Sequence, residues 1–189
     1  MINKLPNLPI TGSNVVVRHL QADDFSAMYR MESDPEVKLY LNGPVRAPRE
    51  EWIRGVESNL YRCQTLAVLA KNNGQFAGRA ALNCYCDKDY LDPEVTREIE
   101  VVISKDYWHR HFGREACKIL ITAVFDALGA KQVIGIVHPQ NENCLKMLHF
   151  FGFKQKGVIS KPSYWQHGHL KFVLTRSDYE KWMLMETNL

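Results

Sequence analysis

Positions 97–128 constrain the fold of this chain more than any other stretch. Residues 98–104 form a short run rich in β-branched side chains, a pattern typical of a strand. From Ala116 onward, apolar residues recur at spacings of three and four until Gly129, which predicts an amphipathic helix that ends there. The stretch therefore predicts a strand, a short turn and a helix in direct succession.

The turn between this strand and this helix is basic and aromatic. It reads Trp108-His109-Arg110-His111-Phe112-Gly113-Arg114. Backbone N–H groups at a helix start lack intrahelical acceptors, and the helix dipole is positive there, so such a turn can bind an anion. Arg110 and Arg114 would add charged donors for phosphate oxygens. Most strand–turn–helix units bind nothing, so a solvated basic surface is the alternative interpretation of the turn alone.

The remainder of the chain alternates between strand and helix patterns, without a linker or an internal repeat. Further strands are expected at residues 14–19, 66–70, 75–86, 132–138, 154–160 and 169–175. Helices are expected from Asp23, from Ala47 and from Asn141, and over residues 178–185. Asn72-Asn73-Gly74 predicts a hairpin turn between two of the strands. This order predicts a single domain of the α/β or α+β class, with a central mixed sheet of about seven strands flanked by helices.

Composition excludes several classes of protein. The 189 residues suit one domain, and the hydrophobic fraction of 46% and charged fraction of 24% are those of an ordinary globular protein. A net charge of +3 is too small to indicate binding to nucleic acid or to a membrane surface. The sequence has no apolar run long enough to span a bilayer and no apolar signal segment at its start, so a cytoplasmic protein is expected.

The five cysteines do not predict a disulfide framework or a metal site. Their number is odd, and Cys84-Tyr85-Cys86 has the spacing C-x-C, with no second pair at a zinc-ligand spacing. On a strand, Cys84 and Cys86 would point to the same face and pack side by side. We therefore expect no metal.

The basic turn resembles the acetyl-CoA-binding motif of the GNAT superfamily of N-acetyltransferases, and within it the RimJ/RimL-like branch. That branch typically has a strand, then tryptophan or glutamine, then Gly-Lys-Gly-Tyr-Ala-Thr-Glu-Ala. The residues in register with this motif are Trp108, Phe112, Gly113, Glu115 and Ala116. His109 and His111 stand where the family usually has glycine. Histidine fits at these positions without strain if φ stays negative, and a protonated imidazole could donate to phosphates.

The resemblance covers nearly the whole chain and implies the GNAT fold, whose mixed sheet is twisted and mostly antiparallel. It implies acetyl-CoA as the cosubstrate, bound by Val101, Val102, Ile103, Trp108, His109, Arg110, His111, Phe112, Gly113, Arg114, Asn141 and Cys144. In the family, a bulge splays the core strand open, and a backbone N–H of that strand meets the oxyanion. The stretch from Val101 to Ile103 matches it.

A second motif, Asn141-Glu142-Asn143-Cys144 followed by Gly152-Phe153, resembles the family's Asn-x-x-Ser…Leu-Gly-Phe signature. Asn141 is expected to cap a helix, and in related enzymes its amide also reaches pantetheine carbonyls. Cys144 stands where many RimL-like enzymes have a serine that protonates the departing thiolate. A thiol of ordinary pKa could do the same, although a small cysteine at a helix start is more often simply packed. The tyrosine acid of other GNAT enzymes is absent, because Leu148 takes its place.

The candidate general bases are Glu98 and Glu100 on the core strand. Because they are two residues apart, they share one face of the strand. Two facing carboxylates raise the pKa of one of them, which suits a base that works near neutral pH. The alternative is a solvated strand edge with Arg97 nearby, or a base that acts through ordered water.

These features together predict an N-acetyltransferase. It would transfer acetyl from acetyl-CoA to a primary amine, either a protein N-terminus or a small molecule, by direct attack through a tetrahedral intermediate. Acidic residues of the segment before the core strand, Asp87, Asp89, Asp92 and Glu94, would help to bind a cationic amine if that segment covers the site. The competing hypothesis is a non-catalytic acyl-CoA-binding module with the same fold. A homodimer is left open, and no nucleic acid or membrane partner is expected.

Overall fold

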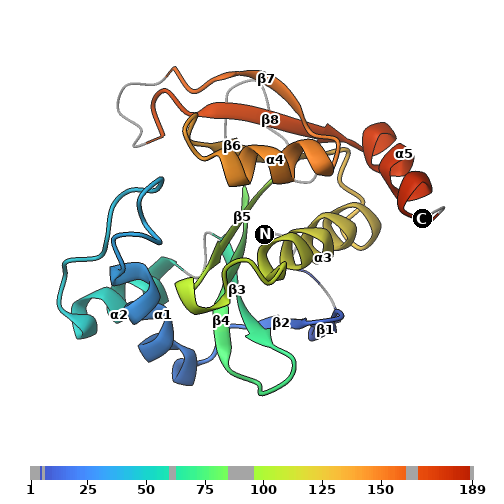
Figure 1. Cartoon of the computed structure of the whole chain (residues 1–189). Coiled ribbons are helices and arrows are strands. Elements are labelled where there is room, and N and C mark those ends of the chain that lie inside the picture. The colour runs from blue at the N-terminus through green and yellow to red at the C-terminus, as the bar shows by residue number, and fades with distance from the viewer. Residues whose placement is uncertain (1–4, 6, 60–62, 85–95, 161–165, 188–189) are drawn as a thin grey trace.

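The computed structural model describes residues 5, 7–59, 63–84, 96–160 and 166–187, which form one eight-stranded sheet and five α-helices (Figure 1). The strands are β1 (Ile10–Thr11), β2 (Val15–His19), β3 (Cys63–Ala70), β4 (Phe76–Cys84), β5 (Thr96–Ile103), β6 (Gln132–Val137), β7 (Lys154–Val158) and β8 (Leu170–Thr175). The helices are α1 (Phe25–Ser33), α2 (Arg49–Asn59), α3 (Phe112–Asp126), α4 (Glu142–Phe150) and α5 (Arg176–Thr187).

The strand order in the sheet is β1-β2-β3-β4-β5-β6-β8-β7, and every neighbouring pair is antiparallel except β5 and β6. The predicted mixed, mostly antiparallel sheet is therefore confirmed. The additional strand is the two-residue β1, which is too short to give a sequence signal. The predicted hairpin is confirmed as well, because Gly74 adopts φ +69° and donates its N–H to Ala70 O between β3 and β4.

The two halves of the sheet separate where β5 meets β6. These parallel strands pair only at Thr96↔Gln132, Arg97↔Val133 and Glu98↔Ile134, and then diverge. β5 meanwhile stays paired with β4 as far as Ile103, and that register is unbroken. The expected bulge in the core strand is therefore wrong for the β4–β5 pair: the strand opens because β6 turns away toward β8, with which it remains paired to Val137.

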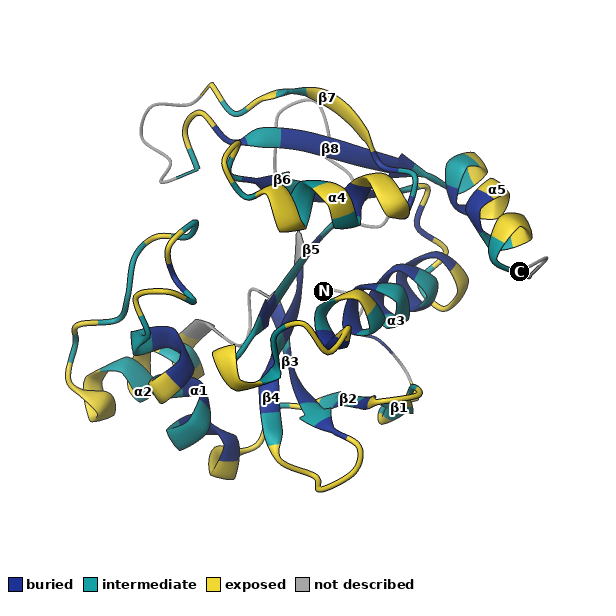
Figure 2. Cartoon of the chain, viewed as in Figure 1, coloured by how far each residue is buried: buried dark blue, intermediate teal, exposed yellow. Residues whose placement is uncertain are grey.

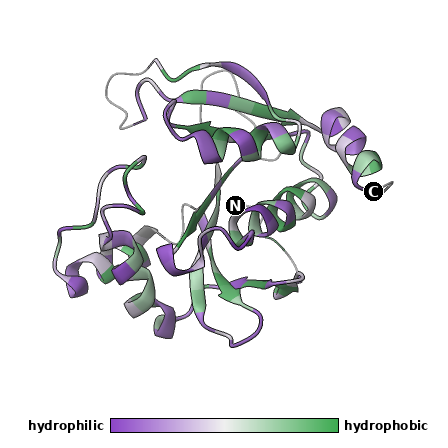
Figure 3. Ribbon diagram, viewed as in Figure 1, coloured by the Kyte–Doolittle hydropathy of each residue, from purple (hydrophilic) through white to green (hydrophobic). Residues whose placement is uncertain are grey.

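Helices cover the two faces of the sheet unequally. The main core lies between one face and α3, α4 and α5, and it includes Leu82, Ile99, Leu120, Leu148 and Trp182 (Figure 2). On the other face, Val102 packs against Met28 and Met31 of α1 in a smaller cluster. Apolar residues concentrate accordingly in the strands and on the inner side of α3 (Figure 3). Among the described residues, no helix combines the length and the apolar run that a bilayer span requires.

Glu115 connects the start of α3 to the N-terminal strands through hydrogen bonds. Its carboxylate accepts hydrogen bonds from Asn14 N at 2.8 Å, Asn14 Nδ2 at 2.9 Å and Val15 N at 3.4 Å. Gly12 lies so close that an added Cβ would stand 2.1 Å from Glu115 Oε1. The family-like glutamate therefore has a structural task here, away from any substrate.

We expect Glu115→Ala to lower the free energy of unfolding by roughly 2 kcal/mol, because three donors lose a charged acceptor. For a domain of this size the melting temperature should fall by about 4–8 °C, which differential scanning calorimetry would measure. Glu142→Ala is the control, since its ion pair with Lys146 joins two exposed side chains at 3.7 Å and should change stability little. Equal melting temperatures for the two variants would contradict the assignment.

Candidate functional site

The turn before α3 has an unusual backbone. His109 and His111 both adopt φ of 61°, whereas Arg110 between them does not have a positive φ. The condition of a negative φ is therefore not met at the two histidines, and the left-handed conformation explains why glycine is usual at these positions. Histidine is among the few other residues that enter this region with some frequency. Alternation in the sign of φ turns successive N–H groups toward one side, which creates an anion-binding concavity.

The N–H groups of this turn are free to bind a ligand. The first backbone hydrogen bond of the helix runs from Glu115 N to His111 O, at 3.0 Å. Within the described part of the chain, the N–H groups of Phe112, Gly113 and Arg114 have no acceptor, as expected for a helix start. The predicted anion site at this position consequently has both the dipole and the unpaired donors that it needs.

Two aromatic side chains hold the turn in place. The Trp108 indole N–H donates to Ile103 O at 2.8 Å, which ties the turn to the end of β5. Phe112 is buried, and its ring lies 5.1 Å from that of Tyr107. Both residues were predicted to bind the cofactor. Their side chains instead anchor the turn, so any contribution to binding would come through the backbone.

The basic side chains of the turn are exposed. The guanidinium of Arg110 lies 5.8 Å from the centre of the Tyr107 ring. That of Arg114 lies 4.4 Å from the centre of the Phe150 ring, at the end of α4. His109 and His111 are exposed beside them. The surface around the free N–H groups is thus cationic, and Arg114 links the helices that follow the two diverging strands.

The core strand presents backbone groups toward the gap in the sheet. Val101 and Ile103 pack against the main core, and Val102 packs against the α1 cluster. Beyond Glu98, the edge of β5 that faces β6 has no pairing with that strand. Alternate N–H groups of this segment therefore point toward the gap, since successive residues of a strand direct their N–H groups to opposite edges.

The start of α4 faces the same region of the fold. Asn141 Oδ1 accepts a hydrogen bond from Cys144 N at 3.1 Å, so the predicted helix cap is confirmed. Burial raises the pKa of the Cys144 thiol to about 11. The assumption of an unperturbed thiol is therefore wrong: Cys144 stays protonated at neutral pH and cannot be a thiolate nucleophile. Its protonated form remains available as a hydrogen-bond donor.

The two candidate bases share the sheet face that α1 covers. Burial first, and the charge of Glu100 second, raise the pKa of Glu98 to about 7, against an opposing hydrogen bond from the Gln166 side chain. Glu100 forms an ion pair with Arg79 at 2.5 Å. Arg97 points the other way and is only 2% exposed, so the alternative of a solvated edge beside Arg97 is wrong. The pair thus contains one carboxylate held by a cation and one that titrates near neutrality.

A pocket of about 400 Å³ lies next to Gln166, the residue whose side chain bonds to Glu98. It is lined by Leu39, Leu41, His138, Pro139, His167, Gly168 and His169. His138 stacks on Tyr40 with ring centres 5.3 Å apart and meets His169 edge to face at 5.1 Å. The residue before His167 is Gln166, whose side chain bonds to Glu98. The pocket therefore brings together the segment after α1, the end of β6 and the turn before β8.

Sequence reasoning missed most of this pocket. The late strand–turn–strand segment offers Ser160, Tyr164 and His167 as candidate lining residues of an acceptor pocket, and His167 does line this pocket, whereas Tyr164 lies outside the described residues. A further signal is that His138 directly follows β6, because ligands bind beyond the carboxyl ends of strands at a topological switch point. The acidic segment with Asp87, Asp89, Asp92 and Glu94 lies outside the described residues, as does Cys86. Within the described chain, no three His, Cys, Asp or Glu side chains are grouped as a metal site would need.

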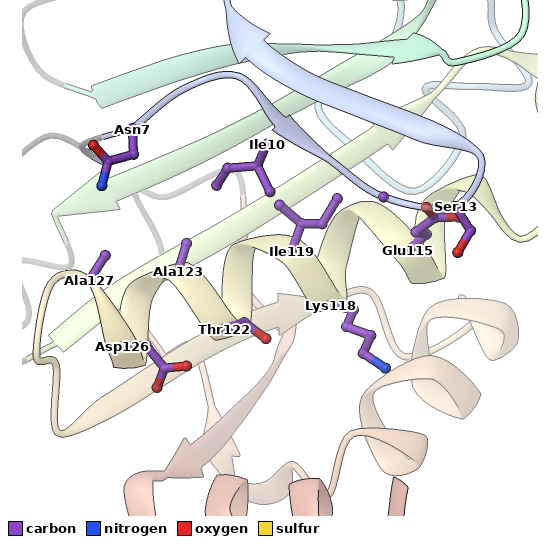
Figure 4. Close-up of a pocket in the computed structure, with 11 residues that line it drawn as sticks. Asn7, Ile10, Ser13, Glu115, Lys118, Ile119, Thr122, Ala123, Asp126 and Ala127 are labelled. Carbon is purple, nitrogen blue, oxygen red and sulfur yellow. The ribbon is translucent and has the colours of Figure 1, made fainter. Parts of the chain in front are cut away.

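A second groove, of about 460 Å³, lies between α3 and the segment that carries β1 (Figure 4). Ile10 of β1 points toward Ile119 across it, and Lys118 and Asp126 lie at its rim. None of the predicted site residues lines it.

Comparisons with known proteins agree on one family. Residues 14–154 match the family model described as the acetyltransferase (GNAT) domain. The chain is 23% identical over 151 residues to the uncharacterized N-acetyltransferase p20 of Bacillus licheniformis, covering 77% of this chain and 82% of that protein.

Solved structures are similar in fold at low identity. One is a spermidine N-acetyltransferase from Vibrio cholerae in complex with CoA and spermine (TM-score 0.74, 13% identity, 89% of this chain and 99% of that chain). Another is AAC(6')-Ib in complex with ribostamycin and coenzyme A (TM-score 0.75, 16% identity, 89% and 97%).

Proposed function

Because the chain belongs to the GNAT acetyltransferase family, we propose that it transfers acetyl from acetyl-CoA to a primary amine by direct attack through a tetrahedral intermediate. The observation that carries this proposal is the arrangement around one gap in the sheet. Free N–H groups at the start of α3 lie beyond the end of β5, and a carboxylate of pKa about 7 lies on β5 itself. One binds phosphate and the other accepts a proton, which are the two tasks that the reaction requires.

The N–H groups of Phe112, Gly113 and Arg114, with the side chains of Arg110 and Arg114, would bind the pyrophosphate of acetyl-CoA. The gap between β5 and β6 would admit the pantetheine arm, and the amide of Asn141 would donate to one of its carbonyls. The Asn141 oxygen is already used as the helix cap, which leaves its NH₂ group to donate.

Chemistry would take place beside Glu98. The acceptor arrives as an ammonium ion and must lose a proton before it attacks the thioester carbonyl, and Glu98 would take that proton. An N–H group of β5 beyond Glu98 would stabilise the oxyanion of the tetrahedral intermediate. Cys144 would donate its proton to the departing thiolate. Its raised pKa makes that donation less favourable than for an ordinary thiol, so its contribution should be modest.

The acceptor would enter the pocket that His138, His167 and His169 line. Its volume of about 400 Å³ suits a small amine or the first residues of a protein N-terminus. The structural neighbours bound to spermine and ribostamycin support a small amine, whereas the RimJ/RimL-like motif is compatible with a protein N-terminus as well as with a small amine. We place the reaction in the cytoplasm, within the RimJ/RimL-like branch, and leave a homodimer as a prediction.

Calorimetry with acetyl-CoA tests the proposed function first. We expect Arg110→Ala combined with Arg114→Ala to weaken binding by about tenfold to thirtyfold, since two exposed cations are lost and the N–H groups remain. The matched control is Arg30→Ala with Arg54→Ala, which removes two exposed arginines from α1 and α2. Release of free thiol only when an amine is added would establish turnover. Binding without turnover for any amine would instead indicate an acyl-CoA-binding module.

A further inference from the structure

Four charged side chains form a continuous array on the sheet face that carries Glu98. Lys38 Nζ lies 2.5 Å from Glu32 Oε2, and Arg79 Nε lies 2.5 Å from Glu32 Oε1. The same Arg79 reaches Glu100 Oε1 through its Nη2, also at 2.5 Å. Cations and anions alternate along the whole array, from the segment after α1 to the core strand.

This array lies mostly inside the protein. The side chains of Lys38 and Glu32 are 4% and 6% exposed, Arg79 is 13% exposed, and only Glu100 reaches 28%. Burying such charges costs desolvation energy that apolar residues of similar size would avoid. A gain in stability therefore does not explain why these charges are buried. A role in positioning other groups does explain it.

Its two ends lie against the two parts of the proposed acceptor site. At one end, Glu100 shares a strand face with Glu98 and adds to the charge that Glu98 experiences. At the other end, Lys38 directly precedes Leu39, which lines the pocket, and its carbonyl accepts from the N–H of Leu41, which lines it too. Arg79 connects the ends, because it stands on β4 diagonally opposite Glu100.

We propose that Arg79 is a positioning residue: its ion pair holds the Glu100 carboxylate in place on the strand face, so that Glu98 is the carboxylate of the pair that takes the proton. Through Glu32 it also ties the pocket wall at Leu39 and Leu41 to the core strand. This inference rests on the proposed function. It assigns Arg79, Glu32 and Lys38 to the reaction without any contact with the substrate.

The other groups around Glu98 do not replace Arg79 in this role. Gln166 reaches Glu98 from the turn before β8, but it is neutral. His169 and Lys171 belong to the β8 side of the same face, where Lys171 pairs in register with Ile136 of β6, beyond the point at which β5 and β6 have separated. Among the described residues, Arg79 is the cation that forms an ion pair with this pair of carboxylates, through Glu100.

The test measures the titration of Glu98 by NMR, in protein with ¹³C-labelled glutamate carboxyl groups. The Glu98 signal is assigned by its absence from a Glu98→Gln sample. With Arg79→Met, no cation offsets the charge of Glu100 beside Glu98, so the midpoint of the Glu98 titration should move to higher pH by about one unit. Arg79→Lys keeps the charge and should hold the midpoint within about 0.3 units of the wild type. In each variant, the acid limb of the profile of kcat/KM against pH should shift in the same direction as the Glu98 midpoint.

Arg79→Met leaves buried carboxylates without their cation, and this variant could fail to fold for that reason. A second variant therefore tests the same proposal. The triple variant Lys38→Met, Glu32→Leu and Arg79→Met replaces the buried charges together and should fold. It should show the same upward shift, together with a raised KM for the amine because the pocket wall is loosened. An unmoved midpoint in the folded triple variant would overturn the proposal. The NMR readout needs no turnover, so this failure is distinct from an absence of acetyl-CoA binding in the wild type.

Discussion

Glu98→Gln is expected to lower kcat by about a hundredfold to a thousandfold while leaving the affinity for acetyl-CoA unchanged. Glutamine has nearly the same shape as glutamate and can still bond to Gln166, but it cannot accept a proton from an ammonium ion. The basic turn that would bind the phosphates lies beyond the far end of β5 and is untouched by the change. Steady-state kinetics with saturating acetyl-CoA would measure the effect.

The pH dependence should identify Glu98 as the source of the effect. A base must be deprotonated to act, and burial together with Glu100 raises the pKa of Glu98 to about 7. For the wild type, kcat/KM should therefore rise with pH through about 7 and then level off, apart from the titration of the amine itself. In Glu98→Gln the limb near 7 should disappear, and only the titration of the amine should remain.

Stability provides a second, independent signature of the same residue. Because the pKa of Glu98 is higher in the folded protein than in the unfolded chain, the folded state binds the proton more tightly. Stability from this group is present at low pH and is lost as pH rises from about 4.5 to about 7, by up to roughly 3 kcal/mol. Glu98→Gln should remove that loss and melt higher than the wild type at pH 8.

Glu57→Gln is the matched control for these measurements, since Glu57 is exposed on α2. It should leave the rate, the pH profile and the melting temperature unchanged. If Glu98→Gln kept kcat within a factor of about two of the wild type, a base acting through water elsewhere would have to be sought.

Local patterns predicted the elements that depend on nearby residues in the chain. The strand and helix on either side of the basic turn followed from the periodicity of apolar residues, and both are confirmed at β5 and α3. The Asn141 cap and the turn at Gly74 depend on hydrogen bonds within a few positions, and they too are confirmed. For such features, the sequence window contains both partners of the interaction.

The properties that sequence reasoning missed depend on distant partners. Arg79 lies 47 positions from Glu32 and 21 from Glu100, so no spacing rule joins them. The pKa of Cys144 follows from burial beneath other elements, and the burial of Arg97 follows from which strand face the core covers. A local pattern gives the type of a residue and its face, but not the charge or solvent content of what packs against it.

The backbone at His109 and His111 falls between these cases. The glycine pattern of the family implied a special conformation, but two histidines would fit without strain only at negative φ. The structure keeps the left-handed conformation with histidine in place of glycine. The conformation of the turn therefore persists although the residue that makes it easy is missing, which suggests that the conformation itself is needed.

Replacement of His111 tests that need directly. We expect His111→Val to weaken acetyl-CoA binding by about a hundredfold, because a β-branched residue is strongly disfavoured at φ 61° and the turn would relax. The N–H groups of Phe112 and Gly113 would then no longer converge, and losing one or two hydrogen bonds to a charged phosphate costs about 3 kcal/mol. Isothermal titration calorimetry would measure the change, with His19→Val, at the exposed last residue of β2, as the control.

His111→Gly separates the backbone from the side chain. Glycine adopts the left-handed region without strain, so it should keep the affinity within about threefold and raise the free energy of unfolding by roughly 1 kcal/mol. If the imidazole itself bound the phosphate, glycine and valine would weaken binding alike. Tight binding by the glycine variant and weak binding by the valine variant would mean that the turn binds the phosphates through its backbone and that the histidines occupy glycine positions without taking over their task.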